Sequence, residues 1–76
     1  MEIKTFLINF TEILEDTDTS FINETVEFRN LEEWDSMTAL SLIAMVDEEY
    51  SVKLTGDDIK TSTTIRDLFD KVSAKI

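Results

Sequence analysis

The apolar residues of this 76-residue chain recur at the spacing of an α-helix in three separate segments. The first segment predicts a helix over about residues 2–15, because its apolar residues fall on one stripe. That stripe consists of Ile3, Phe6, Leu7, Phe10, Ile13 and Leu14. The second segment predicts a helix over 36–50, and the third a helix that begins near Thr64. No proline interrupts the pattern, and Val52-Lys53-Leu54 is too short to indicate a strand.

The predicted fold is all-α, a small four-helix bundle with a long first loop. Three helices are substantial, and a short fourth is expected after the turn at Gly56. Asp35 is a good N-cap for the second helix, and Thr64 and Asp67 have the spacing of a capping box. Eight of the ten positions from Met37 to Val46 are apolar, so we expect this helix to be central. The expected core residues are Phe6, Phe10, Leu40, Ile43, Ile65, Leu68 and Phe69.

The stretch from Asp16 to Asp35 has no steady period and predicts a long loop. A loop of about 20 residues in a small domain is usually functional or held down by its own side chains. We expect its apolar residues to anchor it over the core. These are Phe21, Ile22, Val26, Phe28, Leu31 and Trp34.

Composition excludes several classes of function. With 17 acidic and 7 basic residues, the net charge is −10, which excludes nucleic-acid binding and disfavours anionic membranes. The chain has no Cys and no His, so it lacks thiolate metal ligands and the commonest general base. We therefore expect no self-contained enzyme. The sequence shows no signal peptide and no membrane span, so we expect a single soluble cytoplasmic domain over residues 1–76, and a monomer.

Ser36 is the first candidate functional residue. It directly follows the expected N-cap, where unpaired backbone N–H groups and the helix dipole favour an attached anion. Without a His to take its proton it cannot be a triad nucleophile, but it can be the substrate of another enzyme. Serine at the start of a helix is also common for structural reasons alone, and position by itself leaves that reading open.

The residues around Ser36 provide a more specific signal. They read Glu33-Trp34-Asp35-Ser36-Met37, followed by Leu40, Leu42, Ile43 and Asp47-Glu48-Glu49-Tyr50. This pattern resembles the acyl carrier protein family, whose signature is Asp-Ser-Leu or Asp-Ser-Met at the start of the second helix. The resemblance extends over the whole chain, including the long loop and the last helix.

The resemblance implies a carrier protein. A phosphopantetheinyl transferase would attach 4′-phosphopantetheine from coenzyme A to Ser36, with Asp35 helping to place the metal-bound cofactor. The thiol of the arm would hold an acyl or aminoacyl group as a thioester for fatty acid, polyketide or peptide biosynthesis. Loading and acyl-transferring enzymes with basic docking patches would be the partners, because residues 1–50 hold 13 acids and 2 bases.

Departures from the fatty-acid branch favour a specialised pathway, such as that of the D-alanyl carriers, which share Asp-Ser-Met. Thr38 and Ser41 stand where that branch usually has acids on the second helix. The outward stripe is more apolar than usual, and its expected partner-binding residues are Met37, Ser41, Met45 and Glu48. The alternative to partner contact is that Met37 and Met45 lie in the core.

Two other functions remain open. The first is a calcium-binding EF-hand, since five residues take its loop positions 1, 3, 5, 9 and 12: Asp16, Asp18, Ser20, Glu24 and Glu27. Phe21 at the sixth position argues against it, because that position needs the backbone freedom of glycine. The second is an unmodified protein-interaction domain of the same fold.

Overall fold

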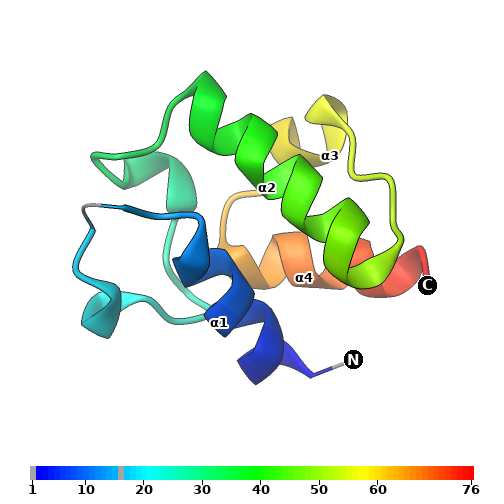
Figure 1. Ribbon diagram of the computed structural model, residues 1–76, viewed down its shortest axis with the longest axis horizontal. Coiled ribbons are helices and arrows are strands. Elements are labelled where there is room, and N and C mark those ends of the chain that lie inside the picture. Colours follow the sequence, from blue (N-terminus) through cyan, green and yellow to red (C-terminus); the bar gives the residue numbers. More distant parts are fainter. Residues whose placement is uncertain (1, 16) are drawn as a thin grey trace.

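The computed structural model describes residues 2–15 and 17–76 and confirms a small all-α fold (Figure 1). Four α-helices and two short 3₁₀ turns follow one another as α1 (Ile3–Glu12), η1 (Thr19–Phe21), η2 (Phe28–Asn30), α2 (Ser36–Tyr50), α3 (Gly56–Lys60) and α4 (Ile65–Ala74). The described residues form no strand, only one isolated antiparallel bridge between Glu27 and Thr64. None of the helices in the described part is long and apolar enough to cross a membrane.

The helices pack around one apolar core. The chain measures 29 × 24 × 20 Å along its principal axes. α1 packs against both α2 and α4, and α3 packs against α4 (Figure 1). Tyr50 at the end of α2 joins α1, because its ring lies 6.0 Å from that of Phe6 and its hydroxyl accepts a 3.0 Å hydrogen bond from Asn9. The fully buried apolar side chains are Phe6, Phe10, Phe28, Leu42, Val46, Ile65, Leu68 and Val72.

Two predictions about the helices need correction. α1 ends at Glu12 and not near residue 15, although Leu14 remains buried in the core. Leu40 was expected in the core and is 60% exposed, because the buried face of α2 is the narrow row of Thr38, Leu42 and Val46 at a four-residue spacing. Ala39, Ile43 and Met45 pack partly against the core, and Met37 and Leu40 are exposed.

The loop between α1 and α2 is held by aromatic packing, as predicted for most of its anchors. Phe28 is fully buried, and Trp34 contacts its ring edge-on at 4.9 Å and stacks on Phe10 at 6.4 Å. Ile22, Val26 and Leu31 pack partly against the core. Phe21 was wrongly predicted as an anchor, since it is 74% exposed.

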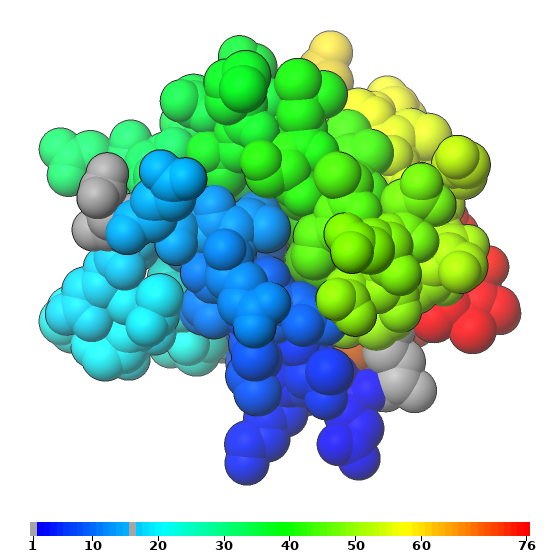
Figure 2. Space-filling view, in the orientation of Figure 1, coloured from blue at the N-terminus to red at the C-terminus, as the bar shows by residue number. Residues whose placement is uncertain are grey.

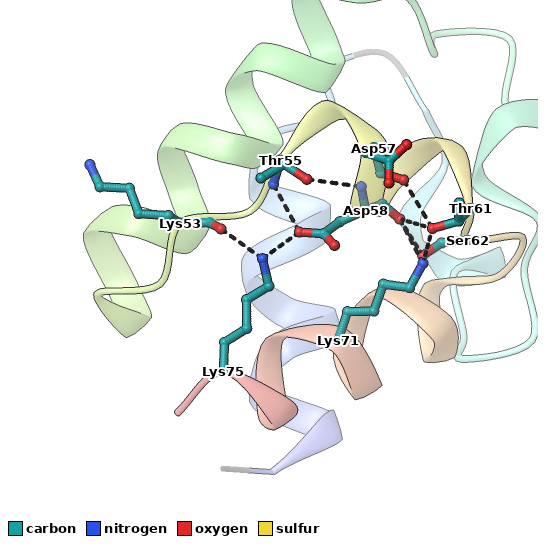
Figure 3. Close-up of polar contacts among 8 residues, drawn as sticks. All are labelled: Lys53, Thr55, Asp57, Asp58, Thr61, Ser62, Lys71 and Lys75. Atoms are coloured by element: carbon teal, nitrogen blue, oxygen red, sulfur yellow. Dashed lines mark hydrogen bonds and ion pairs between the residues drawn. The ribbon is translucent and has the colours of Figure 1, made fainter.

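The short helix α3 begins with a capping box. Thr55 Oγ1 accepts a 3.0 Å hydrogen bond from the backbone N–H of Asp58, and Asp58 Oδ2 accepts one of 3.0 Å from the N–H of Thr55. The ammonium group of Lys75, from the end of α4, binds the same carboxylate and donates to the carbonyl of Lys53 (Figure 3). The carboxylate of Asp58 therefore joins the start of α3 to the end of α4.

The end of α3 is held by two other cations. Lys71 donates to the carbonyl of Asp58 at 3.0 Å and also binds the hydroxyl of Thr61 (Figure 3). Arg29, from η2, donates to the carbonyl of Ile59 at 2.9 Å. Cations suit this position because the last carbonyls of a helix carry partial negative charge. Ile59 is the one buried apolar side chain of α3, so polar contacts from other elements supply much of its attachment.

We expect Asp58→Asn to lower the free energy of unfolding by about 1–2 kcal/mol at pH 7. The hydrogen bond from Lys75, followed by that from the backbone N–H of Thr55, lowers the pKa of Asp58 to about 2. A lowered pKa stabilises the fold above the ordinary carboxyl value, and this contribution is lost as the pH falls from about 4 to 2. The difference between wild type and variant in urea unfolding should therefore disappear over that range. Asp57→Asn, in the same turn, is the control and should show no such difference.

Candidate functional site

The start of α2 is fixed by the capping interaction of Asp35. Its backbone is extended, and its Oδ1 accepts a 2.8 Å hydrogen bond from the backbone N–H of Thr38, as predicted for an N-cap. The hydroxyl of Thr38 lies 3.1 Å from the same oxygen and 3.0 Å from the carbonyl of Glu33. The hydrogen bond from the N–H of Thr38 holds the pKa of Asp35 below its ordinary value. This carboxylate is therefore ionised at neutral pH and a weak base.

Ser36 is the first residue of α2, and its side chain is exposed. Within the described part of the chain, no group forms a hydrogen bond with its hydroxyl. The first turn of a helix leaves backbone N–H groups without intrahelical acceptors, and these groups and the helix dipole favour a phosphate at this end. An enzyme can therefore reach the Ser36 hydroxyl, and a phosphate-linked group on it would have a favourable electrostatic environment.

The segment that precedes Ser36 is anchored on both sides, so Ser36 has a defined position. The Glu33 carboxylate accepts hydrogen bonds from the backbone N–H groups of Glu15 and Thr17 and from the Thr17 hydroxyl at 2.7 Å. Trp34 packs on Phe10, as described above. This role of Glu33 was not predicted. No local signal indicates it, because the two partners are 16 and 18 residues away in the chain.

The outer face of α2 is the set of exposed residues that follows Ser36 along the helix: Met37, Leu40, Ser41, Ala44 and Glu48. Met37 and Leu40 are 70% and 60% exposed and form an apolar surface beside Ser36. Met45, which is also expected to contact partners, is half-buried and packs partly against the core. Glu48 lies twelve residues beyond Ser36, about 18 Å along the helix axis. The face is therefore apolar near Ser36 and acidic at its far end.

Several acids near Ser36 take part in internal contacts. The carboxylates of Glu33 and Asp35 accept the hydrogen bonds already described, and Asp47 forms an exposed ion pair with Lys53 at 3.8 Å. Glu32 and Glu48 are exposed and lie on either side of the apolar surface in the sequence. Part of the acidic excess of residues 1–50 is thus engaged in contacts within the chain.

The proposed calcium loop does not bring its carboxylates together in the part of the chain that the structure describes. Asp18 caps η1 by accepting a 3.0 Å hydrogen bond from the N–H of Ser20, and Glu24 forms an ion pair with Arg66 at 3.4 Å. Asp16, the first loop position, lies outside the described residues. Among residues 2–15 and 17–76, no group of three or more His, Cys, Asp or Glu side chains has the arrangement of a metal site.

Comparison with known proteins adds one result on the family. A family model described as "Phosphopantetheine attachment site" matches residues 8–72 of the chain. This range covers the second half of α1, the long loop, α2, α3 and most of α4, including the capped start of α2. No curated protein matches the chain significantly.

Proposed function

The chain belongs to the acyl carrier family of phosphopantetheine attachment domains, and from this we propose that Ser36 is the residue to which 4′-phosphopantetheine is covalently joined. The observation that carries the proposal is the exposed hydroxyl at the first position of α2. A phosphodiester there would lie beside the free N–H groups of the first helical turn. These features fit the group, which supplies a terminal thiol that holds the cargo as a thioester.

The chain's own part in attachment is to present Ser36 as the nucleophile. A bond forms from its Oγ to the phosphorus of the pantetheine phosphate as the pyrophosphate bond of coenzyme A breaks. Adenosine 3′,5′-bisphosphate leaves, and the hydroxyl proton goes to a base. Asp35 is a poor candidate for that base, because its pKa is lowered and its Oδ1 accepts the capping hydrogen bond. The transferase therefore supplies the base. Asp35, held at the N-cap directly before Ser36, would instead help to place the metal-bound coenzyme A.

The proposed role is that of a carrier with no catalysis of its own. A cargo tethered to Ser36 meets each partner enzyme at a high effective concentration. The chain has no His and no Cys, the residues most apt to attack a thioester. The apolar outer face of α2 supports a dedicated acyl or aminoacyl pathway in preference to bulk fatty-acid synthesis. Delivery of an aminoacyl group is one case of such a pathway.

Mass spectrometry tests the attachment. The chain is incubated with coenzyme A, Mg²⁺ and a broad-specificity phosphopantetheinyl transferase, and the intact mass is measured. We expect the gain of one phosphopantetheine, and fragmentation should locate it on the peptide that contains Ser36. A folded sample that gains no mass, or that carries the group on another residue, would contradict the proposal.

We expect Asp35→Asn to slow attachment about tenfold in kcat/KM while the urea concentration at the midpoint of unfolding stays close to that of wild type. Asparagine caps a helix as well as aspartate does but has no negative charge to position a metal. The initial rate of mass gain and urea unfolding measure the two effects. Asp67→Asn, at the start of α4, is the matched control, since its carboxylate also accepts capping hydrogen bonds but lies on another helix. If Asp35→Asn were modified at the wild-type rate, the role of Asp35 would be limited to capping α2.

We further propose that partner enzymes dock on the outer face of α2 mainly through apolar contact. Leu40→Gln is expected to lower kcat/KM for attachment about tenfold, which is the loss typical of a central interface side chain. Because Leu40 is 60% exposed, the stability should be unchanged. Ser73→Gln introduces the same side chain at an exposed position of α4 and is the control. If kcat/KM for attachment is the same for Leu40→Gln and Ser73→Gln, docking does not use the apolar surface.

A further inference from the structure

The segment that leads into α2 is tied to the segment that follows α1 through one side chain, that of Glu33. Its carboxylate accepts hydrogen bonds from the backbone N–H groups of Glu15 and Thr17 and from the Thr17 hydroxyl. No backbone carbonyl in residues 2–15 and 17–76 accepts from either N–H group. Figure 2 shows the two segments in contact at the surface, where blue to cyan residues after α1 adjoin green residues before α2. Glu33 therefore supplies acceptors that the backbone does not provide where α1 ends.

The backbone of Glu33 is held at the same time by the first turn of α2. The hydroxyl of Thr38 lies 3.0 Å from the Glu33 carbonyl, within reach of a hydrogen bond, and Thr38 is only 8% exposed. The N–H of the same threonine donates to Asp35 at 2.8 Å. Glu33 is thus fixed through its side chain on the α1 side and through its carbonyl on the α2 side.

Ser36 depends on these contacts for its position, because its own side chain provides none. Its exposed hydroxyl forms no hydrogen bond with a described residue. It follows Glu33 by three residues, which can span at most about 11 Å, so a displacement of Glu33 is passed on to Ser36 over a short distance. A misplacement of a reacting group by about 1 Å can lower a rate about a hundredfold. Attachment at Ser36 is therefore sensitive to whatever holds Glu33 in place.

We propose that Glu33 is a positioning residue for the attachment of 4′-phosphopantetheine, an inference that rests on the proposed attachment at Ser36. Its carboxylate holds the segment after α1, and Thr38 holds its carbonyl, so the residues up to Ser36 keep one conformation when the transferase binds. Glu33 acts through the backbone of the residues that follow it and does not itself take part in the reaction. The end of α1 thereby contributes to a reaction at the start of α2.

Glu33→Gln tests the role of the carboxylate. Glutamine has nearly the same size but only one acceptor oxygen, so one of the N–H groups after α1 would face an NH₂ group. We expect kcat for attachment, measured by mass gain at saturating coenzyme A and Mg²⁺, to fall about tenfold. KM for the chain should stay within about twofold of wild type, because the outer face of α2 is unchanged. Glu32→Gln removes the same charge from the adjacent exposed residue, and its kcat should equal that of wild type.

Two kinetic results would overturn the proposal. An unchanged kcat for Glu33→Gln would show that attachment does not depend on this carboxylate. A raised KM with an unchanged kcat would make Glu33 a docking residue. In both cases the wild type is still modified, so the assignment of Ser36 stands. A wild-type chain that gains no mass would instead contradict the proposed function, and this inference with it.

Thr38 provides a second test, at the other side of Glu33. Thr38→Val keeps the shape of the side chain and the N–H that donates to Asp35 but removes the hydroxyl, whereas Thr38→Ser keeps the hydroxyl. We expect kcat to fall about fivefold in Thr38→Val and to stay close to wild type in Thr38→Ser. The effects of Glu33→Gln and Thr38→Val should combine to less than their product, because both loosen the same segment. Equal kcat values for the two Thr38 variants would overturn the proposed role of the carbonyl contact.

Amide hydrogen exchange followed by NMR gives a readout that needs no transferase. In Glu33→Gln, the N–H groups of Glu15, Thr17 and Thr38 should exchange at least about tenfold faster than in wild type, whereas those of α4 should exchange at the wild-type rate. An equal acceleration in α4 would mean that Glu33 stabilises the whole fold and not the position of Ser36 in particular, and it would overturn the proposal. Unchanged exchange at Thr38 would overturn it as well.

Discussion

Ser36→Ala is expected to abolish the mass gain completely when the chain is incubated with coenzyme A, Mg²⁺ and a phosphopantetheinyl transferase. The loss should be total because alanine has no oxygen to bond to phosphorus. The fold should be unaffected, since the Ser36 side chain is exposed and has no hydrogen bond to a described residue, and alanine is a good helix former. We expect the free energy of unfolding to change by less than about 0.5 kcal/mol.

Ser73→Ala is the matched control for this experiment. Ser73 is also an exposed helical serine, but it lies in the last turn of α4 and outside the outer face of α2. It should gain mass at close to the wild-type rate. If Ser36→Ala were still modified, another hydroxyl would be the attachment site and the assignment of Ser36 would be wrong.

Phe28→Ala is expected to lower the free energy of unfolding by about 3–5 kcal/mol, which is the usual cost of removing a buried aromatic ring. Phe28 is fully buried and contacts Trp34 edge-on, and the guanidinium of Arg29 lies 5.1 Å from its ring centre. A domain of this size has a net stability near the low end of about 5–15 kcal/mol. Much of this stability would be lost, and attachment at Ser36 should slow because Trp34 loses one of its two aromatic contacts.

Phe21→Ala provides the comparison, since it removes the same side chain from the same loop at a position that is 74% exposed. Its free energy of unfolding should stay within about 0.5 kcal/mol of wild type. Urea unfolding followed by helical circular dichroism and by the fluorescence of Trp34 measures both variants. If the two phenylalanines gave equal losses, the loop would not be anchored by Phe28.

The helices were predictable because each has local signals at its ends and a periodic apolar pattern between them. Asp35, the start at Ser36 and the end at Tyr50 were all predicted correctly for α2. The end of α1 was not, because Ile13 and Leu14 continue the apolar stripe beyond the helix. Their N–H groups bond to carbonyls three residues back, which tightens the turn but keeps Leu14 over the core. Periodicity therefore indicated which side chains face the core and not where the helix ends.

Burial in the loop and on α2 was harder to predict, because apolar character does not specify which neighbours a side chain meets. Phe21 and Phe28 belong to the same irregular segment, yet one is exposed and the other is fully buried. Leu40 has the hydrophobicity of a core residue but lies on the outer face of α2. The contacts of Glu33 with Thr17, and of Arg29 with Ile59, join distant residues and leave no pattern in the sequence. Ser36 and the N-cap Asp35 were predictable because the signal that identifies them lies in residues next to each other in the sequence.

The attachment of α3 has a consequence for how the chain assembles during folding. Five residues are too few for a helix to persist alone in water, so α3 depends on contacts with the rest of the chain. The cations that hold it come from η2 and from the last turns of α4, which are between 13 and 31 positions away in the sequence. Those elements must be in place before α3 has these partners, so we expect α3 to form late in folding. By the same reasoning we expect it to open readily when the native state fluctuates.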